Sequence, residues 1–213
     1  MSDIASAPHL SVHQLSLARG PKRLFADMNW QLDAGQAMIL RGANGSGKTS
    51  LLRVLAGLTA ADAGEVRWRS LRWSPLCSAQ RASSLYLGHA NALKAELSAD
   101  ENLVNALAFD GIEPDDAART VALDAAGLAG RYHLPVRRLS QGQQRRVGLA
   151  RLALSRKPLW LLDEPTNALD VDGVAIFSAL LEAHLRDGGL ACVATHLPLA
   201  VSASIRELTL GDH

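Results

Sequence analysis

The sequence has 213 residues, of which 48% are hydrophobic, and its formal net charge is +1. This length predicts one α/β domain over 1–213 with room for a small subdomain. A nearly neutral charge speaks against a nucleic-acid partner, because binding to a phosphate backbone usually needs a clear basic excess. The two cysteines, Cys77 and Cys192, are far apart in the sequence and indicate a reducing compartment, where a cysteine acts as a small buried apolar residue.

No segment approaches the roughly 18 consecutive apolar residues that span a bilayer. The first ten residues, MSDIASAPHL, lack a basic region followed by an apolar run, so they do not read as a secretory signal. We therefore expect a protein that stays on the cytosolic side and reaches a membrane only through a partner.

The first part of the chain alternates short β patterns with one helical pattern. A buried strand is predicted at Ala37–Arg41, and a helix follows at Thr49–Ala56. Outer strands are predicted at Leu10–Ala18, Trp30–Leu32 and Glu65–Trp68.

An alanine-rich, mostly helical stretch follows, with helices predicted at Glu101–Phe109 and Asp115–Leu128, and again at Gln141–Ser155. We interpret about 78–156 as a helical subdomain inserted into a catalytic core formed by about 1–77 and 157–213.

The last part of the chain predicts a parallel sheet. Apolar strands at Leu159–Asp163 and Leu190–Thr195 flank a helix at Val171–Leu185, and this spacing implies a right-handed crossover. A final short strand is predicted at Ile205–Leu210.

Residues 42–49 read GANGSGKT and match the phosphate-loop pattern G-x-x-x-x-G-K-[ST] at every fixed position. Glycines let the backbone N–H groups face phosphates, and the start of the following helix adds a partial positive charge. Lys48 is expected to reach the β- and γ-phosphates of a nucleotide, and Thr49 to bind Mg²⁺. The alternative is a glycine-rich turn with a chance lysine. The predicted ATP contacts are Gly42, Ala43, Asn44, Gly45, Ser46, Gly47, Lys48, Thr49 and Ser50.

The predicted strand LWLLD ends in Asp163, and a second acid, Glu164, follows directly. Because α/β proteins bind ligands at strand ends beside such a loop, Asp163 is predicted to hold Mg²⁺ and Glu164 to orient and polarise the attacking water. Taken alone, the pair could equally be a solvated strand end. His196 closes the strand LACVAT, where it could donate a hydrogen bond to the γ-phosphate, although a lone histidine is more often structural.

Residues 139–146 read LSQGQQRR and resemble the LSGGQ-like signature of ABC ATPases. Ser140 and the N–H groups near Gly142 would form a second anion site at a helix N-terminus. The resemblance implies a P-loop NTPase with a mostly parallel core sheet, an antiparallel outer β-sheet and an inserted helical subdomain. It also implies that two copies of the chain sandwich two ATP molecules. Ser140, Gln141, Gly142 and Gln143 would then contact ATP on the opposite copy, and Asp170 would communicate across the interface.

Two positions depart from the family pattern. Where the family usually stacks an aromatic ring on adenine, this sequence has Arg19, whose guanidinium could stack instead. Where the family usually has a Mg²⁺-contacting glutamine, the alignment puts His89.

Together with Trp160 and the segment VDGVA at 171–175, these oddities resemble the ATP-binding subunits of cytochrome c maturation systems. That resemblance implies a peripheral protein on the cytoplasmic face of the inner membrane, held by separate permease subunits. Residues around Ala90–Leu107 would offer a groove to a cytoplasmic helix of those subunits. An ABC ATPase for another cargo, such as lipid or lipoprotein, is the alternative. A soluble ABC machine acting on ribosomes or DNA, or a degenerate nucleotide-binding module, is less favoured.

Overall fold

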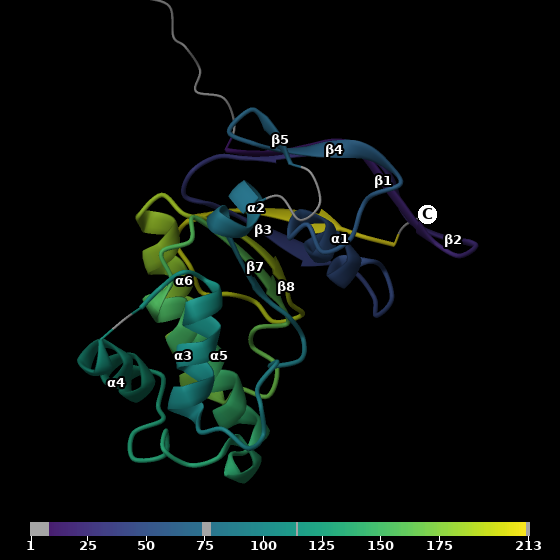
Figure 1. Cartoon of the computed structure of the whole chain (residues 1–213). Helices are drawn as coiled ribbons and strands as arrows, with labels where there is room; N and C mark the ends of the chain where they lie inside the picture. The colour runs from purple at the N-terminus through teal and green to yellow at the C-terminus, as the bar shows by residue number, and fades with distance from the viewer. Residues whose placement is uncertain (1–8, 74–77, 114, 212–213) are drawn as a thin grey trace, which may run out of the picture.

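A computed structural model describes residues 9–73, 78–113 and 115–211, and these form two sheets with helices on both sides of the larger one (Figure 1). The predictions made for Cys77 and for the first eight residues lie outside this part of the chain.

The smaller sheet is antiparallel and has the strand order β2–β1–β4–β5. Its long strands β1 and β2 are joined by a tight turn and form a hairpin. This is the predicted antiparallel outer sheet, although β2 is much longer than the three residues predicted at Trp30–Leu32. Its strands are β1 (Leu10–Arg19), β2 (Lys22–Leu32), β4 (Ala63–Trp68) and β5 (Leu71–Trp73).

The larger sheet is parallel and has the order β6–β7–β8–β3–β9. Every residue of β7 and β8 is buried, as expected for central strands covered on both faces. Because the strands are parallel, the chain segments that follow β3, β7 and β8 meet at one edge. The strands are β3 (Gln36–Arg41), β6 (Ser84–Leu87), β7 (Leu159–Asp163), β8 (Leu190–Ala194) and β9 (Ser204–Thr209).

Two apolar clusters hold these layers together. One contains the buried side chains of helix α1 and fills the space between the two sheets. The other lies on the opposite face of the parallel sheet, under α3, α4, α5 and α6. The helices are α1 (Lys48–Leu55), α2 (Ser78–Ser83), α3 (Ala99–Phe109), α4 (Asp116–Ala125), α5 (Gln141–Leu154) and α6 (Val171–Arg186), with a 3₁₀ turn at Val136–Arg138.

Strand β6 corrects the sequence-based interpretation of the region after residue 77. It lies within the stretch interpreted as helical, yet it pairs in parallel with β7 at the edge of the core sheet. Its four residues, SLYL, are too few for periodicity to separate strand from helix. The helical region of α3, α4 and α5 therefore starts only beyond β6.

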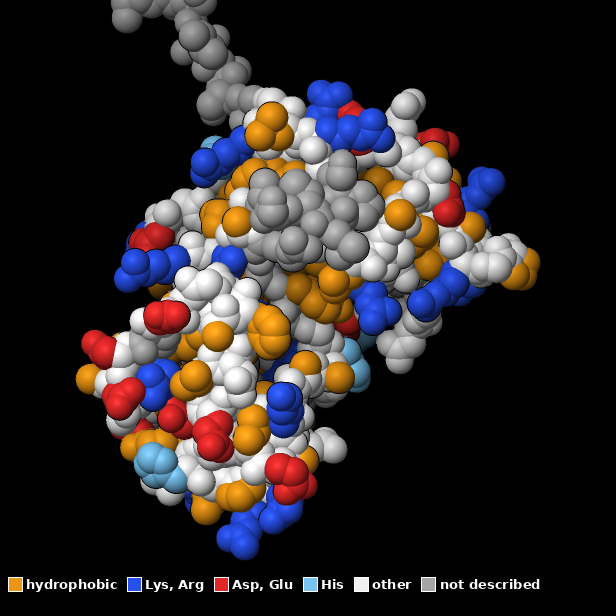
Figure 2. Space-filling model, viewed as in Figure 1, with side chains coloured by type: hydrophobic (Ala, Val, Ile, Leu, Met, Phe, Trp, Pro, Cys, Tyr) orange, Lys and Arg blue, Asp and Glu red, His pale blue; other side chains and the backbone are white. Residues whose placement is uncertain are grey.

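Cys192 is fully buried in the centre of β8, and burial raises the pKa of its thiol. It acts as a small apolar residue, as predicted. Among the described residues, no helix is both long and apolar enough to cross a bilayer. Figure 2 shows acidic and basic side chains interspersed over the helical end, in keeping with the small net charge.

Candidate functional site

The loop between β3 and α1 has a backbone that only glycines can follow at two points. Gly42 has φ +134°, and a Cβ there would lie 2.3 Å from the Leu210 carbonyl oxygen. Gly47 has φ +109° at the start of α1 and packs against Leu24. Because no side chain caps α1, the first N–H groups of the helix remain free to bind an anion.

Lys48 is buried beneath this loop. Its Nζ donates hydrogen bonds to the carbonyl oxygens of Gly42 (2.7 Å) and Ala43 (3.1 Å). The Ser46 hydroxyl is buried in the same loop without a protein partner. A cation, an orphaned hydroxyl and free helical N–H groups together suit a phosphate chain.

Asp163 lies at the end of β7, directly beside the start of α1. The Thr49 hydroxyl donates a 2.8 Å hydrogen bond to Asp163 Oδ2, so the two predicted Mg²⁺ ligands already face each other. Across the described residues, three or more His, Cys, Asp or Glu side chains nowhere gather into a metal cage. One hydroxyl and one carboxylate nevertheless fit Mg²⁺, which usually completes its shell with phosphate oxygens and water.

Glu164 and His196 approach each other across the ends of β7 and β8, with Glu164 Oε1 3.4 Å from His196 Nε2. Glu164 has φ +50°, a left-handed conformation that is uncommon for a residue with a Cβ. Backbone hydrogen bonds hold it there, because its N–H donates to the Ala194 carbonyl and its own carbonyl accepts from Asn167. This geometry aims an acid and an imidazole into the same space.

These groups line one cleft of about 820 Å³. Arg19 enters it from the end of β1, and His89 enters from the segment after β6. The structure thus brings together Arg19, Asn44, Gly45, Gly47, Lys48, Thr49, Ser50, His89, Asp163, Glu164 and His196.

The signature residues lie in a different pocket, of about 550 Å³, lined by Ser140, Gly142, Gln143 and Asp170 among others. Ser140 caps helix α5 by a reciprocal pair of hydrogen bonds with Gln143. Gly142 is needed because a Cβ would lie 2.7 Å from the Ala168 carbonyl. Gln141 is exposed at the first position of the helix. The predicted ATP contacts are therefore divided between two pockets of one chain.

Asp170 borders that second pocket and caps α6. Its carboxylate accepts hydrogen bonds from the Gly173 N–H (2.9 Å) and from Arg146 (2.6 Å). These bonds, chiefly the one from Gly173, lower the pKa of Asp170. The helix that begins at Ser140 and the helix that begins at Asp170 are thus linked beside the signature pocket.

Among the polar side chains in and directly behind the larger cleft, sequence reasoning missed three. Lys22 lines the cleft and donates to the Gly45 carbonyl, and Asn167 lines it from the turn after Glu164. Arg145 is buried behind Asp163 and Glu164. The sequence offered two signals for them: a lysine close to Arg19, and a pair of arginines directly after the signature. Neither signal indicates the direction in which the side chain points.

Comparisons with known proteins show which family this chain belongs to. A family model described as ABC transporter matches residues 25–167. The cytochrome c biogenesis ATP-binding export protein CcmA of Dechloromonas aromatica (strain RCB) is 46% identical over 205 residues, covering 95% of this chain and 100% of that protein. The protein of the same name from Methylococcus capsulatus (strain ATCC 33009 / NCIMB 11132 / Bath) is 46% identical, covering 97% and 100%. A solved ATP-binding cassette, in a dimeric post-hydrolysis state bound to ADP and Pi, superposes with a TM-score of 0.79 at 24% identity, covering 95% and 94%.

Proposed function

Because the chain belongs to the ABC transporter family, we propose that it is the ATP-hydrolysing subunit of a cytochrome c biogenesis exporter. The observation that carries this proposal is the near-full-length similarity to CcmA proteins, combined with a cleft that retains every hydrolytic group the sequence predicts. ATP hydrolysis would drive heme export or the release of a heme-loaded chaperone, as the similarity to cytochrome c biogenesis export proteins implies.

Within the cleft, the loop N–H groups and Lys48 bind the phosphates of ATP, and Arg19 stacks against the base. Thr49 and Asp163 hold Mg²⁺, which supplies electrostatic stabilisation of the phosphoryl oxygens. Glu164 orients and polarises the attacking water, and His196 donates to the γ-phosphate. His89 lines the cleft and would take the role of the family's glutamine.

The division of the ATP contacts between two pockets supports a dimeric active unit. Ser140, Gln141, Gly142 and Gln143 of one copy close over the phosphates bound by the other copy. Asp170, beside the same pocket, would communicate between the two copies across their shared interface. Closure would exclude bulk water from the cleft, and cleavage would release the contact made by His196.

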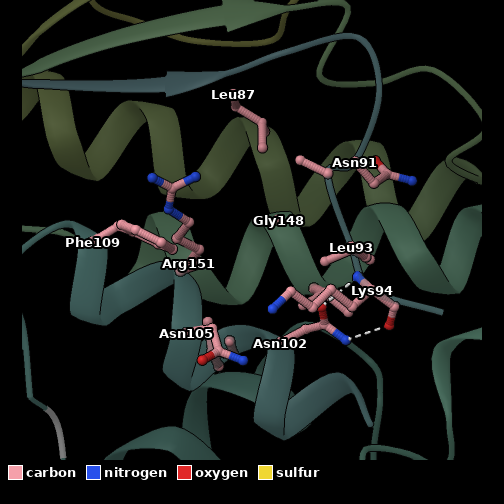
Figure 3. Close-up of a pocket in the computed structure, with 13 residues that line it drawn as sticks. Leu87, Asn91, Leu93, Lys94, Asn102, Asn105, Phe109, Gly148 and Arg151 are labelled. Atoms are coloured by element: carbon pink, nitrogen blue, oxygen red, sulfur yellow. Dashed lines mark hydrogen bonds between the residues drawn. The ribbon is translucent and has the colours of Figure 1, made fainter. Parts of the chain in front are cut away.

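A groove of about 420 Å³ between β6, α3 and α5 is the proposed seat of the membrane subunit (Figure 3). Leu87, Leu93, Leu103 and Val147 give it an apolar floor, and Phe109 stands at its rim with 92% of its surface exposed. Lys94 and Arg151 add basic groups to the walls. An apolar groove with charged edges suits an amphipathic helix. In this arrangement the chain is peripheral, at the cytoplasmic face of the inner membrane.

Gentle detergent extraction from native membranes tests this assignment. The tagged chain should co-purify with integral proteins of cytochrome c maturation, and the Phe109→Ser variant should lose them. The Val121→Ser variant is a matched control, because Val121 is also an exposed apolar side chain of the helical region but lies outside the groove. Recovery of an unrelated permease would contradict the cargo assignment, and a purified dimer without ATP turnover would contradict the enzymatic one.

A further inference from the structure

Arg145 is a buried cation in the middle of the hydrolytic machinery. It lies on α5, 3% exposed, one turn after the signature residues. Nε donates to the Pro165 carbonyl (3.1 Å). One terminal nitrogen, Nη2, donates to the carbonyls of Asp163 (2.9 Å) and Glu164 (2.6 Å).

The other terminal nitrogen, Nη1, reaches a second segment of the chain. It donates to the Gly88 carbonyl and to Asn91 Oδ1, both at 3.0 Å. These five bonds match the five N–H donors of a guanidinium. All five acceptors are neutral oxygens, four from the backbone and one from the Asn91 amide. Burial of this charge lowers the pKa of Arg145, and the nearby carboxylates of Asp163 and Glu164 offset only part of that shift.

Most of the hydrogen bonds from Arg145 go to the backbone around Glu164. Three consecutive carbonyls, from residues 163–165, lie at the point where β7 ends and the chain turns. Glu164 has its left-handed φ at the centre of this turn, and such conformations persist only where the surroundings over-determine them. Arg145 donates hydrogen bonds to all three carbonyls, and it thereby helps to fix the direction of the Glu164 carboxylate.

Asn91 connects the hydrogen bonds of Arg145 to the groove. It lines the groove described above, where Figure 3 labels it near Leu93 and Lys94, and its amide oxygen also accepts from Arg145. Asn91 is absent from the lining of the ATP cleft. A displacement of the segment 88–91 by a helix in the groove would therefore pull on the same guanidinium that positions Glu164.

We infer that Arg145 is a positioning residue that relays the state of the groove, through Asn91 and Gly88, to the backbone of Asp163 and Glu164. This inference rests on the proposed function for the groove and for ATP hydrolysis. Lysine cannot replace the arginine, because three donors on a single nitrogen cannot reach both segments.

The first experiment compares turnover with binding in the full-length chain. Arg145→Lys should lower kcat by about tenfold or more, because small misplacements of a catalytic group are costly, while the Kd for ATP stays within about threefold. Arg119→Lys is the matched control, since Arg119 is a mostly buried arginine of α4 bound to Asp100 and Asp116. It should leave kcat and Kd unchanged. Equal losses of kcat in both variants would overturn the inference.

The second experiment starts from Asn91, which is only partly buried. Asn91→Ala should lower kcat without weakening ATP binding, and Asn91→Asp, which keeps the acceptor, should restore most of the rate. In the Arg145→Lys background, Asn91→Ala should have no further effect, because the two residues act in series. Additive losses, or an unchanged kcat in Asn91→Ala, would overturn the relay.

Amide hydrogen exchange of the nucleotide-free chain provides a readout that is independent of turnover. Asn91→Ala should speed exchange at the Glu164 and Asn167 amides, which bond to the Ala194 and Glu164 carbonyls, and should leave α6 protected. Unchanged exchange at residues 163–167 would overturn the inference. A wild-type chain without ATPase activity would contradict the proposed function instead, and the exchange measurement would still decide the relay.

Discussion

The Thr49 hydroxyl donates a 2.8 Å hydrogen bond to the Asp163 carboxylate, although the two residues lie 114 positions apart in the sequence. This bond joins the first turn of α1 to the end of β7 before any metal is bound. The oxygens that would hold Mg²⁺ are therefore preorganised by the sheet, and binding need not pay to bring the two elements together.

Asp163→Asn should separate metal binding from nucleotide binding. The variant keeps an oxygen near Thr49 but removes the charge, so the Mg²⁺ concentration for half-maximal turnover should rise by at least about tenfold. Metal-free ATP should bind with unchanged or tighter affinity, because a negative charge beside the phosphates is lost. Magnesium titration of the ATPase rate and calorimetric titration with ATP would measure both, and an unchanged Mg²⁺ requirement would contradict the assignment.

Glu164→Gln should keep ATP binding and lower kcat by about 10²–10³-fold, since the amide can accept a hydrogen bond from water but cannot polarise it strongly. Steady-state hydrolysis and a direct ATP titration on the same preparation check this. Turnover at the wild-type rate would mean that another group performs this role.

Lys48→Ala should weaken ATP binding by about 100-fold or more, because it removes the one buried cation of the phosphate loop. Lys22→Ala is the comparison, since Lys22 bonds to the same loop from the exposed hairpin. Its effect should be smaller and should fade at high salt. Equal effects of the two variants in a titration would refute a special role for Lys48.

The effect of Ser140→Ala can be compared with that of Ser98→Ala, because both serines cap a helix in the same way. Ser98 caps α3 with the same reciprocal pair of hydrogen bonds, to Glu101, but lies outside both site pockets. Each alanine variant should lose about 1 kcal/mol of folding stability. Only Ser140→Ala should also lose the ATP-dependent dimer, measured by sedimentation in the Glu164→Gln background. A dimer retained by both variants would contradict the two-chain ATP site.

The stability contributed by Asp170 should depend on pH in a defined direction. Hydrogen bonds from Gly173 and Arg146 lower its pKa below the ordinary value of 3.8. Its contribution is then fully present above about pH 4 and is lost as pH falls through the lower folded-state pKa. Asp170→Asn should therefore be less stable than the wild type in urea at pH 6, with the gap shrinking towards pH 3.

Much of this architecture could be predicted because each motif places an element boundary and its functional residues within one short segment of the sequence. The strand before Gly42, the cap at Ser140 and the acid pair Asp163–Glu164 each combine an element boundary with a chemical group. The neighbours of Arg145 could not be predicted, because its partners come from Gly88, Asn91 and residues 163–165, and only the folded sheet brings these together. Strand β6 was missed for a similar reason, since its pairing with β7 decides its conformation.

Strand β3 delivers the phosphate loop, yet both of its hydrogen-bonding neighbours, β8 and β9, are made much later in synthesis. Arg41, its last residue, donates to the carbonyl of Thr195, 154 positions further along the chain. A ribosome must therefore extend the polypeptide far beyond the glycine loop before that loop has a rigid base. Nascent chains arrested before residue 190 should be protease-sensitive whether or not ATP is present, and ligand protection should appear only once β8 has emerged.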